Sequence, residues 1–189
     1  MGRWEPNARG RLEKAALELY GERGYEQTTA AEIASRSGLT ERTFFRHFAD
    51  KREVLFAGAG ELQDRLVAAV ASVPGSVAPI DAVTGALGAV ATVALQERRT
   101  YARQRQAVIA ANAELHERDL LKLAALASAI ADALRLRGVA DPAAALAAEA
   151  GIAVFKIAFD RWISEPGEPD FQSLIRESLG QLKAVTAGE

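Results

Sequence analysis

Basic, hydroxyl and aromatic side chains alternate between Thr40 and Lys51, in the run TERTFFRHFADK. Arg42 and Arg46 are four residues apart, so they share one face of any helix that this run forms. A guanidinium group on such a face can donate two hydrogen bonds to O6 and N7 of a guanine, and an ammonium group can pair with a phosphate. These residue types at this spacing indicate a helix that binds DNA.

Capping signals surround this run and divide it into helices. A T-x-x-E capping box begins at Thr29, Thr40 can cap a second helix, and a D-x-x-E signature begins at Asp50. Gly38 lies between the first two starts and favours the left-handed backbone of a helix end. The predicted elements are two short helices over residues 30–37 and 41–48 and a long helix that begins at Lys51.

An amphipathic helix is predicted before the capping box. Asn7 can cap its start and Gly24 can end it, giving a helix over residues 7–23. Its apolar stripe consists of Leu12, Ala15, Ala16, Leu19 and Tyr20. The side chains expected to pack on this stripe are Ile33, Ala34, Leu39, Phe44 and Phe48. A small three-helix core therefore supports the basic run.

Composition limits the fold class of the 189-residue chain. Hydrophobic residues make up 49% and charged residues 25%, which is ordinary for a globular protein. Alanine is about a fifth of the chain and favours helix, and no alternating Val, Ile or Thr run indicates a strand. The expected fold class is all-α. The remaining helices are predicted over residues 79–96, 99–111, 113–137, 142–164 and 170–186.

Several function classes are disfavoured by the residues that are missing. The sequence has no cysteine, which excludes disulfides, thiolate metal sites and cysteine nucleophiles. Its two histidines, His47 and His116, have no carboxylate spacing typical of a metal site, so we expect no metal, no cofactor and no catalytic residues. The sequence shows neither a signal-peptide apolar region nor eighteen consecutive apolar residues, which predicts a cytoplasmic protein without membrane contact.

The overall charge does not favour indiscriminate nucleic-acid binding. The net charge is −2, and residues 1–56 carry ten Lys and Arg against nine Asp and Glu. The remainder therefore carries thirteen against sixteen, from totals of 23 and 25. DNA affinity must then come from the local placement of basic side chains and from dimerisation rather than from a strong overall field.

The last two predicted helices are strongly apolar. Their large apolar side chains recur at helical spacing and include Phe155, Phe159, Trp162, Phe171, Leu174 and Leu182. They can form an ordinary intramolecular core. They can also form a dimer interface, in which the two helices pair with their copies as a four-helix bundle. We expect the interface, because a helix-turn-helix protein usually binds two half-sites.

The segment from Arg11 to Phe56 resembles the TetR (tetracycline-repressor-like) family of bacterial transcriptional regulators. The resemblance lies in AALELYGERGYEQTT, EIASRSGL and TERTFFRHFADKREVLF. It implies an N-terminal three-helix helix-turn-helix DNA-binding domain over residues 7–56. A long helix would join this domain to a larger helical domain over residues 57–189, which would bind a ligand and dimerise.

The resemblance also identifies the second short helix as the recognition helix in the major groove. The candidate DNA-binding residues are Thr29, Thr40, Arg42, Thr43, Phe45, Arg46, His47 and Lys51. Lys51 is expected to meet a phosphate through its ammonium group, and Thr29 through its backbone amide. His47 can instead be a buried, hydrogen-bonded histidine, and both alternatives remain open.

Two positions depart from the family pattern. Arg42 stands where a small residue is usual, and Phe45 stands where a tyrosine is usual. Without the phenolic hydroxyl, Phe45 loses one expected phosphate hydrogen bond, but its ring can contact the methyl group of a thymine. The operator preference of this chain is expected to depend on these two residues.

The family's larger domain binds a small-molecule effector. Polar residues on otherwise apolar helices are the natural orienting groups in such a pocket, although each can equally be a surface or capping residue. The candidates are Arg103, Arg105, Asn112, His116 and Asp160. The run RTYARQRQAVIAANAELH is similar to family members with an acyl-CoA-like ligand domain, which implies an effector that is at least partly apolar.

The predicted protein is a homodimeric, ligand-responsive transcriptional regulator. We expect a repressor that a small-molecule effector releases from a pseudo-palindromic DNA operator. Activation stays open, because the DNA-binding chemistry would be the same. The alternatives from other classes are a helical enzyme and a partner-binding helical bundle.

Overall fold

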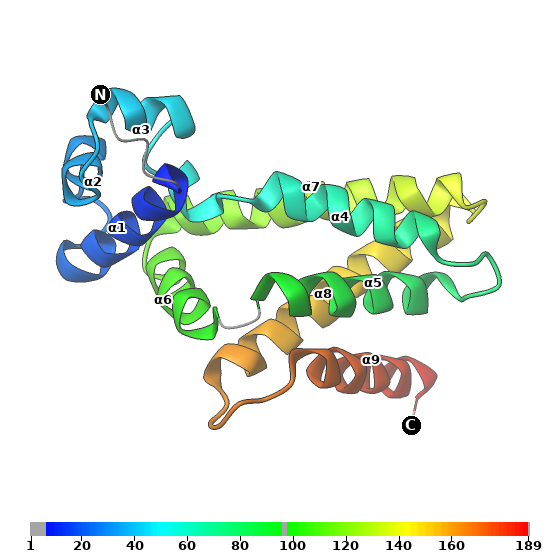
Figure 1. Ribbon diagram of the computed structural model, residues 1–189. Helices are drawn as coiled ribbons and strands as arrows, with labels where there is room; N and C mark the ends of the chain where they lie inside the picture. Colours follow the sequence, from blue (N-terminus) through cyan, green and yellow to red (C-terminus); the bar gives the residue numbers. More distant parts are fainter. Residues whose placement is uncertain (1–6, 96–97, 189) are drawn as a thin grey trace. The chain divides into compact units, whose positions relative to one another are not determined.

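The computed structural model describes residues 7–95 and 98–188, whose regular secondary structure is entirely helical (Figure 1). The elements are α1 (Ala8–Arg23), α2 (Ala30–Arg36), α3 (Glu41–His47), the 3₁₀ helix η1 (Glu53–Phe56), α4 (Ala59–Ser72), α5 (Pro79–Leu95), α6 (Arg99–Ala110), α7 (Ala113–Leu136), α8 (Asp141–Ser164) and α9 (Phe171–Ala187). The all-α fold class is confirmed. The predicted end of the fifth helix at Gln96 lies outside the described residues.

The chain packs as two compact units. The first contains the described residues up to Gly58 together with 104–119, and the second contains residues 59–103 and those from Leu120 onward. Helices α6 and α7 are therefore each divided between the units. The sequence indicated a boundary after Phe56 with the segment 104–119 in the larger domain, whereas the structure groups this segment with α1–α3.

Side chains cap the first helices at the predicted residues. The Asn7 side chain accepts a hydrogen bond from the Gly10 amide at 3.0 Å. Thr29 forms the complete capping box of α2 with Glu32, and Thr40 accepts from the amide of Thr43 at 3.2 Å. These bonds satisfy amide groups that a helix start leaves unpaired. The predicted starts of α1, α2 and α3 are confirmed.

The predicted long helix from Lys51 is wrong, because α4 begins only at Ala59. Asp50 does act as a cap: its Oδ1 accepts from the amides of Arg52 and Glu53 at 2.8 and 3.1 Å. The capped element is the short η1, and Gly58 follows it with a φ of +80°. Such a left-handed residue ends a right-handed helix, so the D-x-x-E signature marks a separate turn.

The core of the first unit forms along the predicted stripe of α1. The buried side chains include Leu12, Ala15, Ala16, Leu19, Tyr20, Ile33, Ala34, Phe44 and Phe48. Leu39, which was expected with them, is only partly buried. The periodic pattern therefore identified this core well, and Phe44 is its largest fully buried side chain.

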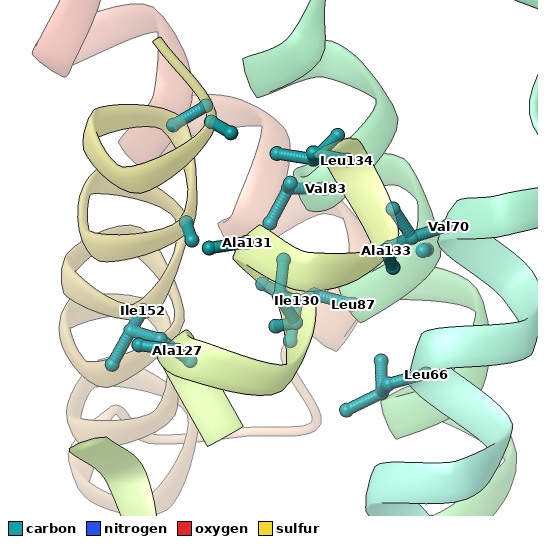
Figure 2. Packing of buried hydrophobic residues seen from close by; sticks show 14 residues of the cluster. Leu66, Val70, Val83, Leu87, Ala127, Ile130, Ala131, Ala133, Leu134 and Ile152 are labelled. Carbon is teal, nitrogen blue, oxygen red and sulfur yellow. The ribbon is translucent and has the colours of Figure 1, made fainter. Parts of the chain in front are cut away.

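The core of the second unit is formed by α4, α5, the later part of α7, and α8. Figure 2 shows Leu66, Val70, Val83, Leu87, Ala127, Ile130, Ala131, Ala133, Leu134 and Ile152 converging in this core. Many of its members are alanines, so the helices approach one another closely. Small side chains permit such packing because they take up little space between two helix backbones.

Helices α5 and α8 approach each other closely at Gly151. A Cβ atom added to Gly151 on α8 would lie 2.3 Å from Cγ1 and 3.3 Å from Cβ of Val83 on α5. Real Cβ atoms do not come that close to another carbon, so any other residue here would force Val83 or the helices to shift. Gly151 therefore sets the distance between the two helices.

Of the six residues predicted at a dimer interface, three are buried inside the second unit and three are partly buried there. Trp162, Phe171 and Leu174 are only 6%, 4% and 4% exposed. Phe155, Phe159 and Leu182 are partly buried against the same cluster. Because the unit's own helices cover Trp162, Phe171 and Leu174, these three side chains do not line a surface for a second copy. For these three the packing corresponds to the intramolecular alternative, while an interface role of Phe155, Phe159 and Leu182 stays a prediction.

The exposed side of α8 carries large apolar residues beside the charged Glu149, Lys156 and Asp160. Leu146 and Ile157 are 71% and 53% exposed, and Ala150 and Ala153 lie between them at helical spacing. Helix α8 has a mean hydropathy of 1.5 over eighteen residues, so it is long and apolar enough to cross a membrane by length and composition. The core helices of water-soluble proteins have the same property.

We predict that Gly151→Ala lowers the free energy of unfolding by about 1–3 kcal/mol, because the new methyl group overlaps Val83. Urea denaturation of the full chain measures this difference. Gly85→Ala in α5 is the control: its Cβ would meet no atom within 4 Å, so stability should stay the same or rise slightly. Adding Val83→Ala should remove the overlap. Equal stability of Gly151→Ala and the parent would contradict the predicted clash.

Candidate nucleic-acid interface

Helix α3 has one buried side and one exposed side. Phe44 is fully buried and Phe48 nearly so, with their ring centroids 5.7 Å apart. Arg42, Arg46 and His47 are all exposed. The alternative of a buried His47 is therefore wrong, while the contact of these three residues with DNA stays a prediction.

The two threonines of α3 are engaged with each other. The hydroxyl groups of Thr40 and Thr43 lie 2.9 Å apart, and that of Thr40 also accepts from the Thr43 amide. Thr40 is exposed and Thr43 partly exposed. A hydroxyl group has one donor and two acceptor positions, so both residues keep hydrogen-bonding capacity for a ligand.

Phe45 is the aromatic residue of the exposed side. Its side chain is 52% exposed, although it neighbours the buried Phe44 in the sequence. The two rings make an edge contact, with centroids 5.3 Å apart and an interplanar angle of 83°. The Phe45 ring therefore leaves the core next to Arg42 and Arg46, at the position where the sequence predicts a DNA contact.

The expected phosphate contact of the Thr29 amide is not available in this structure. Both the backbone N–H and the hydroxyl of Thr29 donate to Oε2 of Glu32, each at 2.9 Å. These hydrogen bonds, the backbone one first, lower the pKa of the Glu32 carboxyl. The amide that was assigned to a phosphate already pairs with a carboxylate, so Thr29 acts as the cap of α2.

Lys51 is also occupied within the protein. Its Nζ donates to the carbonyl oxygens of Tyr25 and Thr28 at 2.9 and 3.1 Å and lies 3.4 Å from that of Glu26. The ammonium group also lies 4.2 Å from the ring centroid of Tyr25, which adds a cation–π attraction. An ammonium group has three donors, and all three have partners here. In this structure Lys51 therefore clamps the loop between α1 and α2, and a phosphate contact would require this clamp to open.

The backbone of Lys51 is also hydrogen bonded within the first unit. The hydroxyl of Tyr20 donates to the carbonyl oxygen of Lys51 at 2.6 Å. Burial raises the pKa of Tyr20 and raises that of Tyr25 to about 12, so both phenols are neutral at physiological pH. Tyr20, Tyr25 and Lys51 thus tie α1, the following loop and the start of η1 together.

Three ion pairs lie within the first unit: two join the 50–56 region to the segment 104–119, and the third lies inside that segment. They link Arg52 with Glu114 at 2.5 Å, Glu53 with Arg118 at 2.6 Å, and Arg105 with Asp119 at 3.2 Å. We refer to these six residues as the ionic junction. Their side chains are partly exposed, so each ion pair alone contributes little to the free energy of unfolding. The main effect of the group is to hold these two regions in a fixed arrangement.

Arg105 also joins the segment 104–119 to the 50–56 region. Its Nε donates to the carbonyl oxygen of Leu55 at 2.6 Å, and its guanidinium lies 5.1 Å from the ring centroid of Phe56.

Arg52 also pairs with Asp50 at 2.6 Å. Burial alone would raise the pKa of Asp50, but hydrogen bonds from Arg52 and from the Glu53 amide outweigh it and hold that pKa below its usual value.

Sequence reasoning did not find the ionic junction. The partners of Arg52 and Glu53 lie 62 and 65 residues away along the chain. No local spacing rule connects residues at such separations. Arg105 was singled out as an effector-binding candidate, and the structure instead pairs it with Leu55, Phe56 and Asp119.

The other effector candidates serve helix ends or lie at the surface. Arg103 donates to the carbonyl oxygen of Ile163, and Asn112 to that of Val108, both at 2.6 Å. His116 and Asp160 are exposed. Asn112 and His116 belong to the first unit, and Arg103 and Asp160 to the second, so neither unit brings the four together. Their role toward an effector stays a prediction.

Metal-binding groups are not assembled in the described part of the chain. Residues 7–95 and 98–188 contain no group of three or more His, Asp or Glu side chains that could hold a metal ion. The exposed groups of the candidate interface are hydroxyl, guanidinium, imidazole and phenyl groups. Such groups can donate hydrogen bonds to phosphates and base edges and make apolar contacts.

We predict that Lys51→Met destabilises the first unit, because three carbonyl oxygens lose a charged donor. Hydrogen bonds to charged groups contribute about 1.5–3 kcal/mol, so the free energy of unfolding should fall by that order. Hydrogen exchange should accelerate at the amides of residues 24–33. Lys14→Met, at an exposed position of α1, is the control and should change neither quantity. Unchanged exchange in Lys51→Met would show that the clamp is not formed in solution.

Two family models match the chain. The model described as bacterial regulatory proteins, tetR family, matches residues 12–57, which include most of α1 and all of α2, α3 and η1. A second model, described as the MftR C-terminal domain, matches residues 77–187. The second match alone covers more than half of the chain, and α4 lies between the two matches.

Individual relatives agree with the family models. The HTH-type transcriptional regulator TcmR of Streptomyces glaucescens is 40% identical over 82 residues, which is 43% of this chain and 36% of TcmR. The chain thus covers only about a third of that relative's length. SmeT, the repressor of the Stenotrophomonas maltophilia multidrug efflux pump SmeDEF, aligns with a TM-score of 0.61 and 19% identity over 94% of this chain and 89% of SmeT.

The fatty acid degradation regulator FadR of Bacillus halodurans has the same fold. It aligns with a TM-score of 0.62 and 16% identity over 96% of both chains. At these identities the two structural matches show the fold alone, whereas the family models identify the chain itself. With the helix-turn-helix match on α1–α3 and the C-terminal match on the helices that follow, this chain belongs to the TetR family of bacterial transcriptional regulators.

Proposed function

We propose that this protein is a homodimeric, ligand-responsive repressor that binds a pseudo-palindromic operator and leaves it when a small molecule binds. The main support for the proposal is the exposed side of α3, which presents Arg42, Phe45 and Arg46 opposite the buried Phe44. A helix of this kind fits the major groove with its polar side toward the bases. A regulator acting on bacterial DNA would work in the cytoplasm.

The DNA contacts divide between base recognition and positioning. Arg42 lies in the first turn of α3 and is long enough to donate two hydrogen bonds to a guanine. Thr40, Thr43, Arg46 and His47 are suited to phosphates and neighbouring base edges. Thr29 and Lys51 would contribute indirectly, by holding the start of α2 and the loop before it. The positive charges that contact DNA directly would then belong mainly to Arg42 and Arg46.

The exposed stripe of α8 supports dimerisation. Leu146 and Ile157 are large apolar residues with the small Ala150 and Ala153 between them, on the side of α8 away from its buried residues. We assign this stripe to a second copy of the chain, since a pseudo-palindrome requires two copies related by a two-fold axis. Small residues in the middle would let the two α8 helices approach closely.

The ionic junction supports a response to an effector. It fixes residues 104–119 to the 50–56 region, which is continuous with the clamp of Lys51 and with α3. Because α6 and α7 continue from this segment into the second unit, a change in those helices would be transmitted through the chain to the first unit. The effector must bind unequally to the two arrangements, as any allosteric ligand must.

We expect repression because the bound dimer would occupy promoter DNA. A dimer bound across a promoter excludes polymerase by covering the DNA, and it needs no further surface to do so. Effector binding would then lower affinity for DNA rather than create a new contact. The effector is expected to be at least partly apolar, as the apolar helices of the second unit suggest.

We predict that fragments selected from genomic DNA share a pseudo-palindrome whose half-site centres lie about 34 Å apart, one helical turn. Arg42→Ala should lose about 1–3 kcal/mol of discrimination at one base pair in each half-site. Arg176→Ala in α9 is the control and should select the same sequence as the parent. Recovery of random fragments by the parent protein, with no sequence in common, would contradict the proposed function.

We predict that Ile157→Glu converts the dimer into monomers. A carboxylate buried in the interface without a partner costs several kcal/mol, so the dimer dissociation constant should rise more than about 100-fold. Sedimentation equilibrium of the full chain measures it. Leu136→Glu, at an 88% exposed position at the end of α7, is the matched control and should remain dimeric. Unchanged association of Ile157→Glu would place the interface elsewhere.

A further inference from the structure

We infer that Phe45 determines part of the operator sequence by recognising the methyl group of one thymine in each half-site. This inference rests on the proposed function, since it assumes that α3 enters the major groove. It assigns to a single side chain an apolar base contact, which is distinct from the hydrogen bonds expected of its basic neighbours.

The exposure of Phe45 is the first observation. Among the large hydrophobic side chains that are exposed in residues 7–95 and 98–188, Phe45 is the one aromatic, at 52%. Single exposed aliphatic residues are common on protein surfaces. A half-exposed phenyl ring between arginines on a short helix is less expected, and it offers a preformed apolar contact.

The fixed position of the ring is the second observation. Phe45 meets Phe44 edge to face at 5.3 Å and 83°, and Phe44 itself is fully buried. The core therefore restrains one side of the Phe45 ring while the other side stays free. A ring that is already positioned loses little conformational entropy when it makes a contact.

The chemistry of the major groove identifies the recognised group. A phenyl ring neither donates nor accepts an ordinary hydrogen bond, so it cannot pair with the N7, O6, N6, O4 or N4 atoms of the bases. Thymine is the base that displays a methyl group in this groove, and apolar side chains recognise it by contact. A thymine methyl is thus the base feature that complements Phe45.

The position of this thymine relative to the guanine read by Arg42 follows from helix geometry. Arg42 precedes Phe45 by three residues, so the two side chains lie on one face of α3. Their separation along the helix axis is about 4.5 Å, against about 3.4 Å between successive base pairs. The thymine should therefore lie one or two base pairs from that guanine.

Replacement of thymine by deoxyuridine tests the contact, because it removes the methyl group alone. Each thymine of the selected operator is replaced in turn, and the dissociation constant of the full-length protein is measured for each duplex. We expect one position in each half-site at which the parent protein loses affinity about fourfold, the size expected for one buried methyl group. Loss of affinity at no position would overturn the inference.

Variants assign the effect to Phe45. Phe45→Ala should bind the thymine and deoxyuridine duplexes equally at that position, and Phe45→Leu should keep part of the difference. Arg46→Ala is the matched control on the same helix: it should weaken binding overall but keep the full difference. An equal loss of affinity in Phe45→Ala and the parent would overturn the inference. A protein that selects no operator would instead contradict the proposed function.

Discussion

The burial of one aromatic ring, Phe44, is the constraint on which the DNA-binding surface depends. Helix α3 has only seven residues, and a helix of that length is not stable alone in water. Phe44 is fully buried, and the Thr40 cap fixes the start of the helix. Because the buried ring sets the rotation of α3 about its axis, it also determines that Arg42, Phe45 and Arg46 face outward.

Much of the charge of the first unit serves its own structure. Lys51 clamps three carbonyl oxygens, and Arg52 and Arg105 belong to the ionic junction. Residues 1–56 carry almost equal numbers of basic and acidic groups, so few cations remain for phosphates. Binding that has few phosphate contacts must depend more on base contacts and on the pairing of two copies.

The structural features that the sequence predicted correctly are those that depend on residues close together in the chain. The caps at Thr29 and Thr40 and the buried side of α3 follow from spacings of three or four residues, and all were confirmed. The partners of Lys51 lie 23–26 residues away, so its clamp had no local signal. The D-x-x-E signature showed where a helix starts but not that Gly58 ends it. The apolar pattern of α8 and α9 fits a core and an interface equally, and only packing distinguishes them.

The central claim is that a dimer binds DNA through α3 in the major groove. Dimethyl sulfate protection of the selected operator tests it most directly, because the reagent methylates guanine N7 in the major groove and adenine N3 in the minor groove. Two recognition helices in successive major grooves should protect guanine N7 atoms in two clusters about ten base pairs apart, on one face of the duplex. Adenine N3 atoms between the clusters should stay reactive. Protection confined to adenine N3, or a single cluster of protected guanines, would contradict a dimer that binds DNA through α3.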